Sequence, residues 1–499
     1  MTFYFYDLET SGINARAQRI MQFAGQRTDE HFNPIGEPQN WVISLTEEVL
    51  PDPEAILVTG ITPQKTLEEG YTEVEFLKLF TKEVLQPDTT IMGFNSVRFD
   101  DEFMRMTLWR NFYDPYEWQW QDGRSRWDLL DAVRMIRALR PEGIQWPFMP
   151  ARPKGITEHG PVIVETESVD KKPVMVESNR LELLTKVNGL DHANAHDALS
   201  DVYATIAVAK LLKQKQPKIF EYLLKMRSKK EVARLVGLQS EQPYLYTSGR
   251  YSSKWQKTTA AATIASVAHG SLLVFDLRCN PAELDKLSDD DLMKAAFSRD
   301  EKTELLPVKT LKINACPAVA PLGVLDEAAQ KRLGLSLDTV AQHFSMLAGI
   351  DGFGERIVAL HEKYQDQRSA TYKKTDDPDF QLYDGFVDEG DKTKMRAIRA
   401  ADRDTMADVQ LDFSDSRLAE LLPRYKLRNF KRSTTATERE HWESYRTKRI
   451  TDGIQGQLSL DQFAKRLQEL SAAKSGDDSA QFLLQELQLY AQNIAPISE

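Results

Sequence analysis

Three short acidic segments contain the residues whose types and spacing could do chemistry. The first holds Asp7 and Glu9, two positions apart at the end of a β-prone run that starts the chain. Residues i and i+2 of a strand point to the same face, so the two carboxylates would lie side by side on an otherwise apolar strand. A bound divalent cation would remove their repulsion, and an all-oxygen ligand set favours Mg²⁺ or Mn²⁺ over zinc. Taken alone, the pair is better explained as a solvated strand end.

Two further segments follow in chain order. Asp100 closes the run 95–100 after a predicted strand, where it would begin a helix, and acids in a first helical turn normally compensate the helix dipole. His196 lies at or just outside the start of an amphipathic helix, and Asp201 lies five residues further on. A single histidine at that place is more often a capping or surface residue.

Together the three segments supply Asp, Glu, Asp, His and Asp. Four carboxylates can hold two divalent metal ions about 4 Å apart, an arrangement that stabilises the attacking and leaving oxygens in phosphoryl transfer. The histidine could take the proton of the attacking water. The ordered set therefore predicts a metal-dependent site for phosphodiester hydrolysis.

The elements that must position these residues are those of an α/β domain. The hydrophobic pattern predicts strands at 3–8, 20–26, 41–45 and 90–94 and helices at 74–85, 126–139 and 197–214. Strands mixed with helices favour a central sheet that helices cover. Residues 146–177 are rich in Pro and Gly and are predicted to form a loop or hairpin insertion, with β-like pieces at 161–167 and 173–177. Asn179 and Glu182 have the spacing of a capping box that opens a helix at 180–186.

The remaining chain divides into two further regions. From about residue 216, short β candidates recur at 243–247, 271–277 and 307–313, which predicts a small barrel-like domain. Residues 368–391 are polar and acidic, and Asp376–Asp379 resembles a linker. Beyond them helix-forming stretches dominate, for example at 417–422, 460–471 and 480–493, and predict a helical domain.

Length and composition limit the class of protein. The 499 residues suffice for about three domains, and 41% apolar with 28% charged residues is typical of soluble globular proteins. We expect no transmembrane helix and no signal peptide. The two cysteines, Cys279 and Cys316, exclude a disulfide framework and a structural zinc site and fit a reducing cytoplasm. The net charge of −11 argues against a generally basic nucleic-acid coat protein but is compatible with a local basic track.

The ordered acidic set resembles the DEDDh family of 3′→5′ exonucleases, whose third motif is His-x-Ala-x-x-Asp. The chain resembles the bacterial exonuclease I family, single-stranded DNA 3′→5′ exonucleases, over nearly its whole length. This likeness is carried by residues 6–10, 59–63, 95–103, 110–116, 125–131, 139–144, 194–198, 202–207, 314–317 and 381–386. The resemblance implies an RNase H-like exonuclease domain with a mixed sheet at 1–215, an SH3-like domain containing a β-barrel at 216–368 and an all-α C-terminal domain at 369–499.

The resemblance also assigns roles within the site. It implies that two Mg²⁺ ions, for which Mn²⁺ can substitute, are bound by Asp7, Glu9, Asp100 and Asp201, with His196 as the general base. Glu9 and Thr10 would lie near the terminal nucleotide, and Arg180 would contact the terminal phosphate. Asp101 and Asp197 are better explained as solvated or supporting carboxylates than as ligands.

Basic and aromatic residues suggest a track for a single strand. Residues 104–120 interleave the two types, and aromatic faces can stack on bases while arginines meet phosphates. Some of these rings must instead belong to the core, and lysines on a helix such as those at 210–234 are often only a solvated face. The resemblance favours DNA contacts at Arg105, Tyr116, Trp120, Arg134, Lys229 and Lys309. A second cluster at 424–432 in the third domain could close the channel from the other side.

The family also docks the acidic C-terminal tail of single-strand DNA-binding protein. Arg140 and Tyr222 match part of that pocket. Asp326 falls where a basic partner is expected, so the pocket is predicted to be weakened or rebuilt. The insertion at 150–177 lies near the third motif in sequence and could modify substrate entry.

The sequence thus predicts a processive, monomeric, cytoplasmic enzyme that releases 5′-mononucleotides from single-stranded DNA in repair and recombination. Two alternatives stay open. A DEDDh ribonuclease that trims RNA 3′ ends shares the five site residues but would commonly lack the second and third domains. A non-catalytic single-strand-binding scaffold would keep the basic track but lose a carboxylate, and all four are present.

Overall fold

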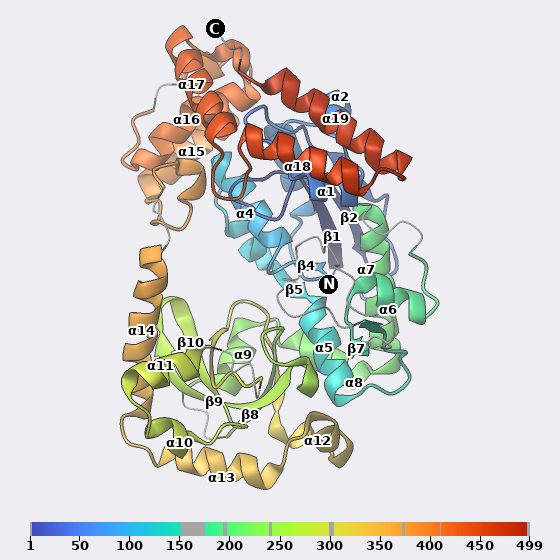
Figure 1. Cartoon of the computed structure of the whole chain (residues 1–499), viewed down its shortest axis with the longest axis vertical. Coiled ribbons are helices and arrows are strands. Elements are labelled where there is room, and N and C mark those ends of the chain that lie inside the picture. The colour runs from blue at the N-terminus through green and yellow to red at the C-terminus, as the bar shows by residue number, and fades with distance from the viewer. Residues whose placement is uncertain are drawn as a thin grey trace.

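The computed structural model describes residues 2–150, 175–192, 197–238, 242–298, 304–371, 375–409 and 411–496. It is organised around two five-stranded sheets and a set of C-terminal helices (Figure 1). Among the described residues, no helix combines the length and apolar character needed to cross a bilayer.

The first sheet is mixed, as predicted, with strand order β3-β2-β1-β4-β5. Its strands are β1 (Thr2–Thr10), β2 (Ile20–Thr28), β3 (Gln39–Val42), β4 (Thr89–Gly93) and β5 (Ser125–Asp128). The pairs β1/β2 and β2/β3 are antiparallel, whereas β1/β4 and β4/β5 are parallel. Phe3 and Phe5 enter one hydrophobic core while Tyr4, Tyr6 and Leu8 enter another, so β1 is buried on both faces.

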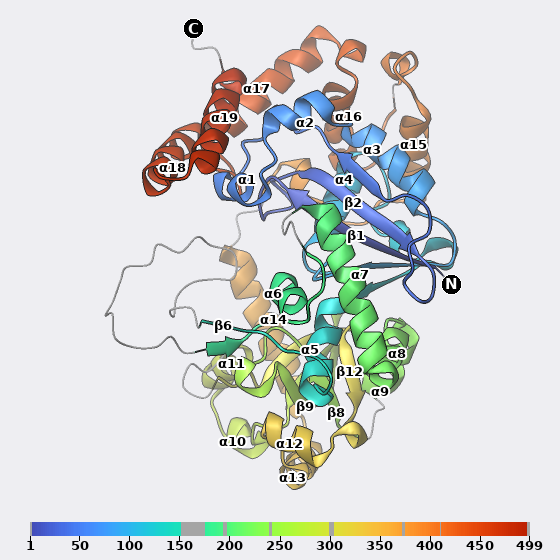
Figure 2. The ribbon, with the colours of Figure 1, turned by 90° about the vertical axis from the view of Figure 1, so that its right-hand side faces the viewer.

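Among the described residues, nine helices accompany this sheet; some of them cover it, and the last of them packs on the second sheet. They are α1 (Pro53–Thr59), α2 (Pro63–Glu69), α3 (Glu73–Leu79), α4 (Asp100–Arg110), α5 (Leu129–Leu139), α6 (Leu181–Val187), α7 (Ala198–Lys215), α8 (Pro217–Lys225) and α9 (Lys229–Val236). A π-helical turn at Phe80–Val84 continues α3. The long helix α7 packs on β1 and β2 and also on α5, α6 and α8 (Figure 2).

Two local predictions for this domain are wrong. The helix expected from residue 126 begins at Leu129, because Ser125–Asp128 pairs in parallel with β4 and the Asp128 side chain caps the helix. Arg180, not Asn179, is the N-cap of α6, and the described residues give it no side-chain cap, so the capping box does not form. The Glu182 carboxylate instead accepts a hydrogen bond from Arg180.

The second sheet is fully antiparallel, with strand order β11-β10-β9-β8-β12. Its strands are β8 (Tyr244–Thr247), β9 (Thr258–Val267), β10 (Ser271–Asp276), β11 (Val308–Lys312) and β12 (Ala318–Pro321). The accompanying helices are α10 (Pro281–Asp285), α11 (Asp289–Phe297), α12 (Glu327–Leu333), α13 (Leu337–Ala348) and α14 (Phe353–Thr371). Strands β9 and β12 were not expected from the sequence; β9 is rich in Ala and Thr, and its burial comes from the partner strands.

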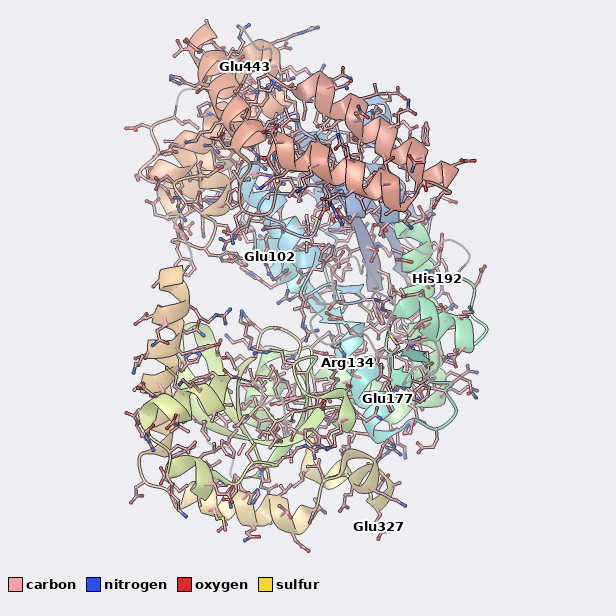
Figure 3. The ribbon with its side chains drawn as sticks, viewed as in Figure 1. Glu102, Arg134, Glu177, His192, Glu327 and Glu443 are labelled. Atoms are coloured by element: carbon pink, nitrogen blue, oxygen red, sulfur yellow. The ribbon has the colours of Figure 1, made fainter. Side chains whose placement is uncertain are left out.

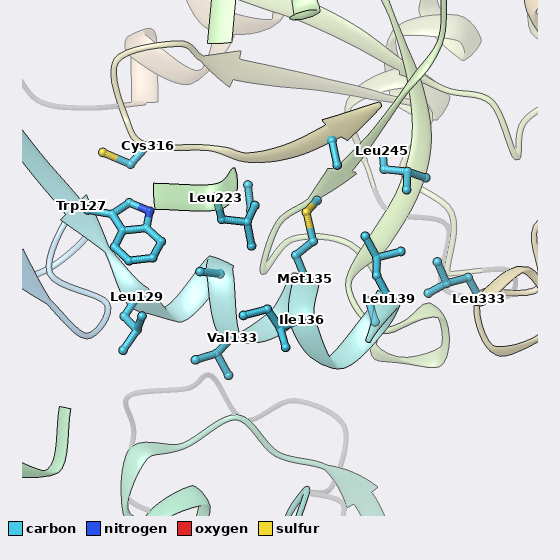
Figure 4. Close-up of a cluster of buried hydrophobic side chains, with 14 of the residues drawn as sticks. Trp127, Leu129, Val133, Met135, Ile136, Leu139, Leu223, Leu245, Cys316 and Leu333 are labelled. Atoms are coloured by element: carbon cyan, nitrogen blue, oxygen red, sulfur yellow. The ribbon is translucent and has the colours of Figure 1, made fainter. Parts of the chain in front are cut away.

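Helix α5 joins the first two domains into one core (Figure 4). Its apolar side chains, such as Val133 and Ile136, pack in the same cluster as Leu223 of α8, Leu245 of β8 and Leu333 of α12. The second domain is therefore held to the first by continuous hydrophobic packing, which favours a fixed orientation between them.

The third domain is helical, as predicted. It contains α15 (Glu389–Ala400), α16 (Ser416–Asn429), α17 (Ala436–Asp452), α18 (Leu460–Ala473) and α19 (Asp478–Ile494), and α18 and α19 pack on α1 (Figure 1). Two contacts tie this domain to the loop that follows β1. Arg449 donates a hydrogen bond of 2.6 Å to the carbonyl of Ala17, and Gln18 donates one of 3.0 Å to the carbonyl of Gly456.

The segment predicted to be a linker, Asp376–Asp379, is exposed at its first residue but buried at Pro378 and Asp379. Asp379 is 0% exposed, and its carboxylate is bonded by Arg428 and lies within 3.8 Å of Arg19. Glu48, also 0% exposed, accepts from the same two arginines at 2.9 Å each. Although burial alone would raise both values, the arginines hold the pKa of Asp379 well below its usual range and that of Glu48 at about 2. The sequence around Asp379 does not reveal this burial, because its cationic partners Arg428 and Arg19 lie far away in the chain.

This buried ion network gives a stability prediction. Asp379→Asn removes the charge that Arg428 and Arg19 face and leaves buried cations without compensation, so the free energy of unfolding should fall by about 3–5 kcal/mol. Urea denaturation followed by circular dichroism measures it. The matched control is Asp376→Asn, three residues earlier and exposed, which should change little. Equal effects of the two substitutions would contradict the role of the network.

Candidate active site

The carboxylates of Asp7, Glu9 and Asp201 come together at the end of β1. Each of the three offers an oxygen within 4.8 Å of the others, and Glu9 is 8% exposed. Asp7 and Glu9 are two positions apart on β1, just before a register shift at Thr10. Asp201 comes from the first turn of α7, which packs across β1. The spacing of two on a strand and the helical third segment thus produce the proximity that the sequence suggested.

The start of α7 is fixed to the sheet by side chains of β2. Asp197 is the N-cap and accepts from the Ser200 amide. Gln22 donates to the Asp197 carboxylate at 3.3 Å and accepts from the Ala198 amide at 3.5 Å. These bonds set where Asp201 lies relative to β1, and they show Asp197 in a supporting role.

The first residue of α4 is Asp100, as predicted, and it is 4% exposed. The turn before it is held by Asp128, whose carboxylate accepts from the amides of Asn95 and Val97 at 2.9 and 3.2 Å. Gly93 permits the turn, because a Cβ there would lie 2.5 Å from the Cβ of Ser96. The backbone of Leu8 on β1 acts to lower the pKa of the Asp100 carboxyl against the effect of burial, which places that carboxyl next to the strand that carries Asp7 and Glu9.

The electrostatics of these acids indicate a cation site. Burial first, and then the Asp201 and Asp100 carboxylates, raise the pKa of Glu9 to about 9. Burial also raises the pKa of Asp7 and Asp100 well above the usual range, with neighbouring carboxylates adding to the shift. Among the described residues, Asp7, Glu9 and Asp100 make no ion pair with Lys or Arg. A crowded set of carboxylate oxygens without cationic side chains fits hard divalent ions such as Mg²⁺.

His192 is a neighbour of the site that the sequence prediction missed. Figure 3 labels His192 beside α6 and α7. Its Nε2 lies in hydrogen-bonding contact with Asp201, and its Nδ1 lies 3.1 Å from the hydroxyl of Thr185 on α6. The predicted base, His196, lies outside the described residues. A signal for His192 existed, since a second histidine precedes the third motif by four positions, but a single spacing carried no reason to select it.

Two other predicted site residues lie close to this region. Thr10 is 6% exposed, and its hydroxyl donates to the carbonyl of Gly12 at 2.8 Å, so it shapes the loop after β1. Arg180 precedes α6, which packs on α7, and its side chain is 46% exposed and pairs with Glu182 at 3.3 Å. Arg180 is therefore accessible near the helix that carries Asp201.

The predicted DNA-contact residues lie on several elements. The Arg105 guanidinium lies 5.7 Å from the centre of the Tyr116 ring, and Trp120 is 61% exposed. Arg134 on α5 pairs with Asp131 at 2.7 Å and lies against Gly249 of the second domain (Figure 3). Trp120 is therefore exposed, whereas Arg105 and Arg134 are largely buried and paired with carboxylates.

The other predicted DNA contacts are two lysines, Lys229 and Lys309, and two further aromatic residues also stand out. Lys229 is exposed at the start of α9, and Lys309 of β11 covers the Tyr246 ring at 4.5 Å. Tyr383 donates to Glu102 of α4 at 2.6 Å, and Phe386 is 90% exposed. The sequence analysis does not predict contacts at these last two residues, although an exposed phenylalanine in a polar segment is a signal for binding.

Two cations of the basic cluster at 424–432, Lys426 and Arg428, are buried and so do not present their charge to a channel, whereas Lys431 and Arg432 are exposed. Arg428 is only 2% exposed and is bonded to Glu48 and Asp379. Lys426 is 8% exposed and donates to the Val409 carbonyl. Arg428 thereby links the third domain to the first, whereas the partners of Lys426, Val409 and Glu438, lie within the third domain. The charge of both cations is used within the protein, which a run of basic letters cannot reveal.

Arg140 and Asp326, which stand out in the predicted partner pocket, form an ion pair. Their closest atoms are 3.0 Å apart, and Arg140 also donates to the Val324 carbonyl at 2.8 Å. Tyr222 lies on α8, which packs on α5, the helix that ends just before Arg140. Asp326 thus occupies the guanidinium that an acidic partner would use.

Only the ends of the predicted insertion are described. β6 (Phe148–Pro150) pairs with β7 (Met175–Glu177), so the expected strand at 173–177 is present in part, whereas residues 161–167 lie outside the described residues. Glu177 accepts from Gln256 of the second domain. The base of the insertion therefore contacts that domain.

Comparison with known families divides the chain into three matches. Residues 4–209 match the family described as "Exonuclease", residues 227–363 the "Exonuclease I SH3-like domain" and residues 376–494 the "Exonuclease I C-terminal domain". The matched segments correspond to the three regions of the fold.

Individual relatives cover the whole chain. Exodeoxyribonuclease I of Haemophilus influenzae is 36% identical over 496 residues, which is 98% of each chain. Exonuclease I of Methylocaldum szegediense is 37% identical, with a TM-score of 0.86 over 99% of this chain and 100% of that one. Escherichia coli exonuclease I in complex with a dA16 oligonucleotide is 35% identical, with a TM-score of 0.87 over the same shares.

The carboxylate cluster gives a cation-binding prediction. Mg²⁺ or Mn²⁺ should stabilise the folded protein by about 2.7 kcal/mol at a concentration a hundred times its Kd, because only the folded state gathers the oxygens. Asp201→Asn should abolish this gain while raising stability without the cation, since one repelling charge is gone. Thermal denaturation with and without the cation measures both effects.

The control for this measurement is Asp338→Asn, an exposed carboxylate in α13. It should respond to the cation as the wild type does. A cation-induced gain that persists in Asp201→Asn would show that the ions bind elsewhere.

Proposed function

The chain belongs to the exonuclease I family and is an exonuclease, and from this premise we propose that it hydrolyses single-stranded DNA from the 3′ end to 5′-mononucleotides. The observation that supports the proposal is the gathering of Asp7, Glu9 and Asp201 at the end of β1 with Asp100 beside them. The oligonucleotide complex of the Escherichia coli relative supports the choice of substrate.

We propose that Asp7, Glu9, Asp100 and Asp201 hold two divalent cations, with Mg²⁺ as the natural ion. A zinc-bound form of Escherichia coli exonuclease I with single-stranded DNA supports a divalent-ion site without selecting Mg²⁺. Bound there, the ions would neutralise charge on the scissile phosphate and ease ionisation of water. Glu9 and Asp100 are buried and Asp7 and Asp201 partly so, and the oxygens of Asp7, Glu9 and Asp201 lie within 4.8 Å of one another.

The remaining site residues would bind and move protons. His196 would take a proton from the attacking water at an imidazole nitrogen. Arg180, exposed near α7, would pair with the terminal phosphate, and Glu9 with Thr10 would border the terminal nucleotide. His192 would hold Asp201 in place through the contact described above.

The strand would follow the exposed aromatic and basic surface away from the site. Arg105, Tyr116 and Trp120 would contact it on the first domain, and Arg134, Lys229 and Lys309 would contact it at and beyond the border with the second. Aromatic stacking is tolerant of base identity, and a path over several domains favours processive digestion of a single strand. The proposed domain limits are 1–215, 216–368 and 369–499, supported by the end of α7 at Lys215 and the end of α14 at Thr371.

The cellular setting is also a proposal. A similar solved structure contains single-strand DNA-binding protein with exonuclease I, which supports that protein as a partner of this chain. We propose that the chain acts as a cytoplasmic monomer in repair and recombination. The RNA-trimming alternative is weakened by the second and third domains, which match the exonuclease I family.

The first test is digestion of end-labelled single strands. Wild type with Mg²⁺ should release a 3′ label at once and a 5′ label only late, and EDTA should stop both. Asp201→Ala should lose most of the activity, since it removes a proposed cation ligand. A matched RNA strand should be digested more slowly.

The same assay contains its own control. Asp338→Ala, remote from the site, should digest the strand as the wild type does. If wild type bound the strand but released no label under any divalent cation, the scaffold alternative would replace the proposal.

The partner pocket gives a second test. Asp326→Ala should free Arg140 from its ion pair and tighten binding of a peptide with the acidic tail of single-strand DNA-binding protein by about tenfold, the effect expected for one charge-assisted contact. Fluorescence anisotropy of a labelled peptide measures it, and Arg140→Ala should weaken binding. Unchanged affinity in both variants would place the pocket elsewhere.

A further inference from the structure

Asp101, next to the proposed ligand Asp100, is the centre of a buried hydrogen-bond network. Its carboxylate is 2% exposed and accepts from the Tyr6 hydroxyl at 2.7 Å and from the Gln119 side chain at 3.2 Å. Tyr6 immediately precedes Asp7 on β1. The network therefore touches both β1, which carries Asp7 and Glu9, and α4, which carries Asp100.

Arg126 connects this centre to the second domain. One arm of its guanidinium donates to Asp101, and the other donates to the carbonyl of Asn314 at 2.8 Å. The same loop returns to the arginine's backbone, because the Cys316 thiol donates to the Arg126 carbonyl at 3.2 Å. The loop between β11 and β12 thus holds Arg126 at both its backbone and its side chain.

A third branch leads to the proposed DNA track. Arg105 lies 3.6 Å from the Asp101 carboxylate and donates to the Gln119 side chain at 3.4 Å. The other side of its guanidinium covers Tyr116. One buried carboxylate therefore meets the strand of the active site, an arginine of the track and, through Arg126, a loop of the SH3-like domain.

We propose that Arg126 is a positioning residue that sets the register between the SH3-like domain, with the DNA strand it carries, and the catalytic carboxylates. This inference rests on the proposed function and adds a residue to it. Arg126 would not touch the reacting phosphate. It acts through Asp101, so that a strand bound along both domains reaches the carboxylates with its terminal phosphodiester in the correct place.

The geometry explains why an arginine is required. Two separate nitrogens of the rigid guanidinium fork donate to a carboxylate in one domain and to a carbonyl in another, whereas the three donors of a lysine share one nitrogen and have no fixed fork to span both acceptors. Without Arg126, Tyr6 and Gln119 still donate to Asp101, so the carboxylates of the first domain keep their support. What is lost is the tie to Asn314.

The test compares two substrates with Arg126→Lys. A small ester, thymidine 5′-monophosphate p-nitrophenyl ester, reaches only the active site, whereas a long oligonucleotide also reaches the SH3-like domain. We expect kcat on the long strand to fall by about tenfold or more, because small misplacements of a reacting group are costly. Turnover of the small ester should change little. On strands of increasing length, the wild-type rate should rise once the strand spans both domains, and the variant should lose this rise.

The matched control is Arg124→Lys. Arg124 lies two residues earlier and its side chain is 4% exposed, but it donates within the first domain, to the carbonyls of Trp118 and Leu85. It should affect both substrates alike, through stability alone. Thermal denaturation and circular dichroism of each variant exclude unfolding as the cause.

The outcomes separate the inference from the function beneath it. Equal losses on both substrates in Arg126→Lys, matching those of Arg124→Lys, would overturn the positioning role and reduce Arg126 to a structural residue. A long-strand rate identical to wild type would overturn it too. If the wild type cleaved neither substrate, the proposed exonuclease function would be at fault.

Discussion

Mutual repulsion among buried carboxylates is the constraint on which the rest of this structure depends. Asp7, Glu9 and Asp100 lie where burial and one another raise their pKa, and such a cluster is unfavourable unless cations join it. The fold must hold these groups together against that repulsion. It does so with a strand buried on both faces, with a helix start fixed to β2 by Gln22 and with a turn held by Asp128.

Elsewhere in the protein, buried acids are paired with arginines, and their pKa is lowered instead of raised. Asp379 and Glu48 are more deeply buried than the site carboxylates, yet arginines hold their pKa low. Asp131 likewise has a lowered pKa beside Arg98 and Arg134, once burial is outweighed. Acids paired with arginine keep their negative charge without a metal ion, whereas the three site acids named above lack such partners among the described residues. The oxygens of those three acids are therefore available to bind a metal ion. The contrast marks the active site more sharply than burial or position alone.

Features that depend on neighbouring residues could be predicted from the sequence, whereas contacts between residues far apart in the chain could not. The two-residue spacing of Asp7 and Glu9 and the helix start at Asp100 could be predicted because both depend on neighbouring residues. The buried state of Asp379 could not, since it depends on Arg428 and Arg19, which lie 49 positions later and 360 positions earlier in the chain. The burial of Lys426 and Arg428 within the cluster at 424–432 could not be predicted for the same reason. His192 was missed because its role depends on how α6 and α7 pack.

The contacts from Arg449 to Ala17 and from Gln18 to Gly456 have a bearing on synthesis of the protein. They link the loop that follows Glu9 to groups that are synthesised 432 and 438 residues later. Domains usually fold as they emerge, so the first sheet can form early, but the loop beside its carboxylates acquires these supports only after residues 449–456 have been made. A nascent chain that ends before residue 449 would contain Asp7, Glu9, Asp100 and Asp201 but would lack the contacts of Arg449 and Gly456 to the loop after β1. The order of translation thus delays the final form of this loop until α17 has docked.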